Sequence, residues 1–85
     1  MKREETLRDA REKLEKAGCP EPAADAEVLL AHVLGIDRPR LLLDRRLPLD
    51  GRARATFARR IDRRRRREPV AYITGEREFW SLPFH

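Results

Sequence analysis

Arginine is the residue type in this sequence with the clearest capacity for chemistry, because five arginines form one unbroken run at residues 63–67. Arg59 and Arg60 precede this run by about one helical turn. Guanidinium groups bind carboxylates and phosphates through paired hydrogen bonds, so a cluster of them can recognise an acidic surface. We therefore select five candidate partner-binding residues: Arg59, Arg60, Arg63, Arg64 and Arg66.

The positive charge of the chain is concentrated in one segment. Residues 51–68 contain nine arginines against Asp62 and Glu68, a net charge of +7, whereas the segments before and after each have a net charge of −1. Cations near the C-terminus of a helix are stabilised by the helix dipole, so the favoured interpretation is a solvated helix end. Contact with nucleic acid, and contact with an acidic protein surface, remain the alternatives.

The sequence contains no recognisable catalytic constellation. It has no glycine-rich phosphate loop and no pair of histidines at metal-ligand spacing, and Ser81 is its only serine. We interpret His32 as a partly exposed helix residue and Cys19 as an inert apolar one. No catalytic, cofactor-binding or metal-binding residue is predicted, and we expect the 85 residues to be inactive alone.

The elements that position the arginines follow from apolar spacing and from helix start and stop signals. Thr6, three residues before Asp9, predicts the start of a first helix, and Gly18 predicts its end. The apolar stripe of residues 22–34 predicts a second helix, with Pro22 in its first turn and Gly35 as its C-terminal cap.

Two aspartates predict the starts of the next helices. Asp37 begins a short third helix, for which we expect the three leucines at residues 41–43 to supply buried surface. Asp50 begins a long fourth helix that Pro69 ends, and its predicted inner face is Ala53, Phe57, Ala58 and Ile61. Because Arg64 and Arg65 continue that face, its last turns are expected to project into solvent or towards a partner.

The C-terminal part of the sequence changes its periodicity. Residues 69–75 predict a short fifth helix, with Val70 and Ile73 pointing inward and Gly75 as its stop. Trp80, Leu82 and Phe84 then alternate with other residues, as in a strand, and an unpaired strand is not stable. We expect residues 76–85 to begin a further domain. Folding back onto the bundle and tail exchange within a dimer are the alternatives.

The size and composition set further limits. Eighty-five residues correspond to one small domain or a piece of a larger protein. The single cysteine excludes an internal disulfide, and no apolar run approaches the roughly 20 residues that cross a bilayer. We therefore expect a cytoplasmic protein that does not contact a membrane.

Two segments resemble a known family. DAEVLLAHVLG (residues 25–35) and REPVAYITGEREFWSLPF (residues 67–84) are similar to the N-terminal domain of the bacterial release factor glutamine methyltransferases, the PrmC or HemK family. The order of the helices also matches. The resemblance implies an all-α bundle of five helices at residues 1–75. It also implies that residues 76–85 start a linker hairpin to an α/β methyltransferase domain that is absent from these residues.

The resemblance implies a function for the parent protein rather than for this segment alone. The parent would transfer a methyl group from S-adenosylmethionine to the glutamine of the Gly-Gly-Gln motif in class 1 peptide chain release factors. This segment would help to hold the release factor and would contact its own catalytic domain. It contains no cofactor residue. The alternative function is an autonomous basic module that binds nucleic acid through residues 59–67.

Overall fold

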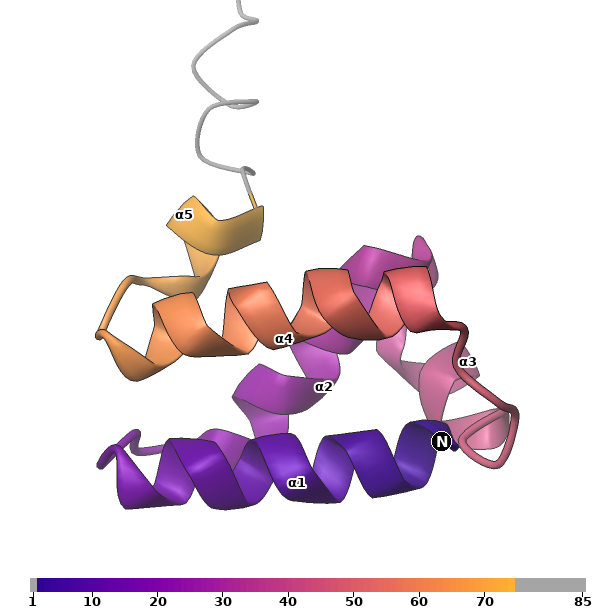
Figure 1. Ribbon diagram of the computed structural model, residues 1–85, viewed down its shortest axis with the longest axis horizontal. Coiled ribbons are helices and arrows are strands. Elements are labelled where there is room, and N and C mark those ends of the chain that lie inside the picture. The colour runs from indigo at the N-terminus through magenta and orange to yellow at the C-terminus, as the bar shows by residue number, and fades with distance from the viewer. Residues whose placement is uncertain (1, 75–85) are drawn as a thin grey trace, which may run out of the picture.

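The protein forms a bundle of five helices in the computed structural model, which describes residues 2–74 (Figure 1). The predicted all-α fold class is confirmed for this part of the chain. The expectations for Gly75 and for residues 76–85 fall outside the described residues. The helices are α1 (Arg3–Lys16), α2 (Pro22–Leu34), α3 (Arg38–Leu43), α4 (Gly51–Arg65) and α5 (Val70–Thr74).

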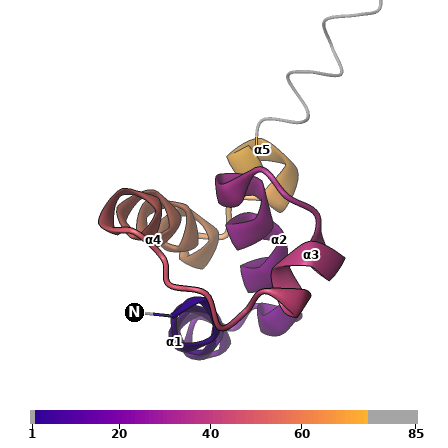
Figure 2. The same cartoon turned by 90° about the vertical axis from the view of Figure 1, so that its right-hand side faces the viewer.

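Helix α2 is the centre of the bundle, because it contacts each of the other four helices. Helices α1 and α4 contact each other and run in the same direction, with α2 behind them (Figures 1 and 2). The residues of α2 that face these neighbours include Leu29 and Leu30, which are both fully buried. Burying one leucine side chain contributes about 1.5–3 kcal/mol, so this apolar helix holds the others in place.

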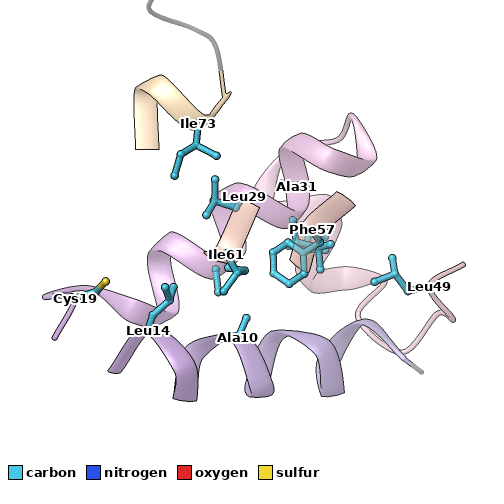
Figure 3. Packing of buried hydrophobic residues seen from close by; sticks show 12 residues of the cluster. Ala10, Leu14, Cys19, Leu29, Ala31, Leu49, Phe57, Ile61 and Ile73 are labelled. Atoms are coloured by element: carbon cyan, nitrogen blue, oxygen red, sulfur yellow. The ribbon is translucent and has the colours of Figure 1, made fainter. Parts of the chain in front are cut away.

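The core lies between the three long helices and extends to α5 (Figure 3). Ala10 and Leu14 point from α1 towards Phe57 and Ile61 of α4, and Ile73 of α5 points towards Leu29. The predicted inner face of α4 is partly correct. Phe57 and Ile61 are buried, Ala53 is half-buried, and Ala58 is exposed.

The predicted aspartate caps at the starts of α3 and α4 are confirmed. A carboxylate oxygen of Asp37 accepts a hydrogen bond from the Arg40 N–H at 2.9 Å, and one of Asp50 accepts from the Ala53 N–H at 2.7 Å. Such caps stabilise a helix by about 0.5–2 kcal/mol each.

The predicted start of α1 at Thr6 is wrong. The helix begins at Arg3, and Thr6 is a buried residue inside it. The N–H groups of Arg3 and Glu4 donate to the carbonyls of Leu47 and Arg45 in the loop between α3 and α4, at 3.1 and 2.9 Å. Distant carbonyls therefore satisfy donors that a local cap would otherwise serve, and the helix extends further back than the sequence indicates.

Three helices end in the same hydrogen-bond pattern, the Schellman motif, which needs one residue in the left-handed conformation. Gly18 and Gly35 supply that residue after α1 and α2, at φ +84° and +72°. Arg67 supplies it after α4, at φ +73°. The predicted stops at Gly18 and Gly35 are confirmed, but α4 ends through Arg67 and not through Pro69.

The leucines of α3 do not all contribute to the core, contrary to the prediction. Leu41 is fully buried, whereas Leu42 and Leu43 are 42% and 82% exposed. The helix is six residues long and, among the helices that the structure describes, packs only on α2, so one face alone is covered there.

Candidate functional site

Arg64 lies between helices and not at a free helix end. It follows the buried Ile61 on the inner face of α4, and its Nε donates to Asp25 Oδ2 of α2 at 2.9 Å. Its Nη1 also donates to the Glu68 carbonyl at 3.0 Å. The Arg64 and Asp25 side chains are only 15% and 17% exposed. The expectation that the last turns of α4 project away from the bundle is therefore wrong, because this ion pair extends the α2–α4 contact.

Arg63 closes the end of α4 together with Glu68. Its Nε and Nη2 each donate to one carboxylate oxygen of Glu68, both at 2.9 Å. These residues occupy the two positions of the Schellman motif that are often joined by an apolar contact. Here a bidentate ion pair takes that place. The hydrogen bonds from Arg63 hold the pKa of the Glu68 carboxyl below its ordinary value of 4.5, although partial desolvation opposes the shift.

Arg60 links three helices. Its Nη1 donates to the Ile73 carbonyl of α5 at 3.3 Å and lies 3.0 Å from His32 Nδ1 of α2. An arginine N–H can only donate, so His32 Nδ1 acts as the acceptor in this contact. The prediction that His32 is a helix residue is consistent with this position, since it lies on the exposed side of α2.

Arg59 and Arg66 are the candidate residues that remain most available. Arg59 is exposed, and its only recorded contact within residues 2–74 is a long hydrogen bond of 3.4 Å to Thr56. The Arg66 side chain is 73% exposed, with its Nη2 2.7 Å from Asp62 Oδ2 one turn earlier. An exposed pair of this kind contributes little to stability.

The structure brings four of the five predicted residues together. Arg59, Arg60, Arg63 and Arg66 line one open depression of about 620 Å³ on α4, together with Thr56, Ala58 and Asp62. Arg64 is not among them. The sequence placed these arginines on one helix, but it could not show that Asp25, 39 residues away, pairs with Arg64.

A second candidate region, which was not predicted, lies around α3 and the loop that follows it. Leu47 follows α3 and is 47% exposed, and Leu42 and Leu43, four and five residues earlier, are exposed as well. Leu42 also borders a hollow of about 160 Å³ that is lined by residues of α1, α2 and the loop after α3. The available sequence signal was three consecutive leucines on a helix too short to bury them all.

A third hollow lies between α1 and α4, with a volume of about 300 Å³. Its lining includes Ala10, Phe57 and Ile61, with Lys13 and Arg54 among its polar residues. Within residues 2–74 no three His, Cys, Asp or Glu side chains gather as metal ligands would. In the same range no helix has the length and apolar character needed to cross a membrane.

Comparison with known proteins places this geometry in context. The model of the PrmC N-terminal domain family matches residues 5–75. The release factor glutamine methyltransferase of Vibrio cholerae is 48% identical over 80 residues, which are 94% of this chain and 28% of that protein. That of Cereibacter sphaeroides is 43% identical over 84 residues, which are 99% and 30%, respectively. No solved structure matches the chain. The chain spans less than a third of the length of these curated relatives.

Proposed function

Because this chain belongs to the PrmC N-terminal domain family, we propose that it is the substrate-recognition domain of a protein methyltransferase. Its protein substrate would be a class 1 peptide chain release factor, and the methylated group would be the side-chain amide of the glutamine in the Gly-Gly-Gln motif. The observation that carries this proposal is the extent of the family match. It covers all of α2 to α5 and nearly all of α1.

The cofactor of the reaction would be bound outside these 85 residues. S-adenosylmethionine supplies the methyl group in the proposed reaction, and the sequence has only four glycines, none of them in a glycine-rich loop. The chain would therefore contribute binding energy and orientation rather than chemistry. Contacts far from the reacting atom can hold a protein substrate in a reactive position, which lowers the entropic part of the barrier.

The exposed arginines of α4 would form a charged rim for this substrate. Arg59 and Arg66 are the members of the candidate set with the weakest internal constraints, and exposed charges at a rim mainly affect the association rate. Arg60, Arg63 and Arg64 are each held at 3.3 Å or less by other groups of the bundle. This internal use of the run counts against an autonomous nucleic-acid-binding module.

Deleting the domain from a relative provides a direct test. Removal of the matching 80 residues from the Vibrio cholerae enzyme should raise the KM for the intact release factor. The activity towards a short peptide that contains Gly-Gly-Gln should change much less. An equal loss with both substrates would contradict a role in recognition, because it would mean that the domain supports the catalytic part itself.

Binding measurements on the isolated chain complement this test. Calorimetry should detect binding of the 85-residue chain to the release factor and no binding of S-adenosylmethionine. Binding of the cofactor at micromolar concentration would contradict the proposed division of labour.

A further inference from the structure

The loop after α3 forms a turn that is fixed in place. The Leu47 N–H donates to the Asp44 carbonyl at 3.0 Å, which closes a turn with Arg45 and Arg46 at its two corners. The carbonyls of Arg45 and Leu47 accept from the first N–H groups of α1. The backbone of the turn is therefore anchored on both sides of Arg46, and it needs little further ordering when it binds a partner.

This turn presents apolar and basic groups side by side. We define the turn surface as Leu42, Leu43, Arg45, Arg46 and Leu47. Three exposed leucines within six residues exceed the scattered apolar residues that a surface normally carries. Leu43, at 82% exposed, has the largest exposed fraction of the four large apolar residues that stand out in residues 2–74.

The arginines around these leucines are weakly paired within the chain. Arg45 lies 4.0 Å from Glu4, and Arg8, in the adjoining hollow, lies 4.0 Å from Asp9. The side chains of Arg11 and Arg46 have no ion pair or hydrogen bond among residues 2–74. Arg8, Arg11 and Arg45 line the hollow together with Glu4 and Glu27, and Arg46 follows Arg45 in the turn. Most of the bonding capacity of these four guanidinium groups is unused among residues 2–74.

The position of the turn surface indicates which kind of molecule covers it. Among the helices of residues 2–74, α3 contacts only α2 and makes no contact with α5 (Figures 1 and 2). A partner on the turn surface would therefore not need to contact α5. A second copy docked symmetrically would bring like charges together, because each copy would present Arg45 and Arg46 to the other.

From these observations we propose that the turn surface binds a segment of the substrate protein that carries both acidic and apolar side chains. Its carboxylates would lie opposite the arginines, and an apolar side chain would lie against the leucines. This proposal rests on the proposed function, which identifies the substrate protein as a release factor. It is distinct from the rim on α4, since the turn surface supplies both apolar area and unpaired charge.

The test measures binding of the 85-residue chain to the class 1 release factor by calorimetry. Leu43→Ser and Arg46→Glu should each weaken binding severalfold, and the double variant should weaken it by at least about tenfold. Both side chains are exposed, so thermal unfolding followed by circular dichroism should show little change.

Lys16→Glu is the control, since it makes the same charge change as Arg46→Glu on an exposed residue at the far end of α1 from the turn. The affinity of this variant for the release factor should stay within about twofold. A double variant that binds as tightly as the original chain would overturn the proposal.

A second probe separates failure of this proposal from failure of the proposed function. An amphipathic helical peptide of leucine and glutamate should bind the original chain better than the same peptide with lysine in place of glutamate, and the double variant should lose this preference. If the release factor does not bind but the glutamate peptide does, the turn surface stands and the proposed substrate is wrong. If neither binds, or if the preference survives in the double variant, the proposal is wrong.

Discussion

Two of the arginine-bearing regions of this domain, the end of α4 and the turn surface after α3, use their arginines differently. In the first, Arg63 and Arg64 bond to Glu68 and Asp25 at 2.9 Å and thereby fix helix ends. In the second, Arg45 approaches its nearest carboxylate only to 4.0 Å, and Arg46 has no partner within residues 2–74. The density of charge along a sequence is therefore a poor guide to the charge that is available to a partner.

The largest expected effect concerns Arg64. Arg64→Ala should lower the free energy of unfolding by about 2–3 kcal/mol, because it leaves the largely buried Asp25 carboxylate without its partner. This loss is at or below the lower end of the range for breaking a buried ion pair, because both side chains keep some contact with water. Urea unfolding measures the change. Arg46→Ala, the matched change on the turn surface, should stay within about 0.5 kcal/mol. Equal losses for the two variants would remove the distinction between the regions.

Substitutions of the glycines that end α1 and α2 test how much the Arg67 side chain contributes to the stability of the fold. Gly35→Ala should cost about 1 kcal/mol, because a side chain at positive φ is strained. No clash adds to this cost, since the new Cβ would meet no atom of residues 2–74 within 4 Å. Gly18→Ala has the same strain, and its Cβ would also lie 2.9 Å from Arg67 Nη2, which donates to the Ala17 carbonyl. Its cost should be larger by about 0.5–1 kcal/mol, the contribution of one hydrogen bond.

A double variant serves as the control for this pair. In the background of Arg67→Ala, the cost of Gly18→Ala should fall to that of Gly35→Ala. If the difference persists without the Arg67 side chain, its contact with α1 does not stabilise the fold.

The ion pair of Glu68 should make stability depend on pH. Its pKa is lowered in the folded state, chiefly by the hydrogen bonds from Arg63, so the unfolded state binds the proton more readily. The contribution is therefore present above the ordinary value of 4.5 and is lost as the pH falls through the lower, folded pKa. Glu68→Gln should be less stable than the original chain at neutral pH, and the difference should shrink in acid. Glu12→Gln, the matched change on an exposed residue, should change the stability at neutral pH by no more than about 0.5 kcal/mol.

The smallest expected effect concerns the rim on α4. The double variant Arg59→Glu, Arg66→Glu should lower the association rate with the release factor a few-fold and alter its salt dependence, with little change in the dissociation rate. Stopped-flow measurements at two ionic strengths separate these quantities. A dissociation rate that rises more than it does for Leu43→Ser would instead place the main contact on α4.

Local signals in the sequence predict much of the fold. The bounds of α2 follow from Pro22 and Gly35, and the starts of α3 and α4 follow from Asp37 and Asp50, because each signal acts within a few residues. The family resemblance is likewise confirmed by the match over residues 5–75.

The errors arise where distant groups decide the local structure. The start of α1 depends on loop carbonyls more than 40 residues away, and the orientation of Arg64 depends on Asp25 in another helix. The leucines after Leu41 were assigned to the core because composition shows that a residue is apolar, but not that its neighbours leave it uncovered. The candidate rim on α4 was located by sequence, whereas the turn surface required the bundle to be assembled.

The measurement that tests this account most directly is a nuclear magnetic resonance titration of the isotope-labelled 85-residue chain with unlabelled release factor. We expect the largest changes in the amide signals of residues 42–47 and of the adjoining residues 7–11, with smaller changes at residues 59–66. Changes confined to residues 59–66, with those of the turn surface unaffected, would contradict the account.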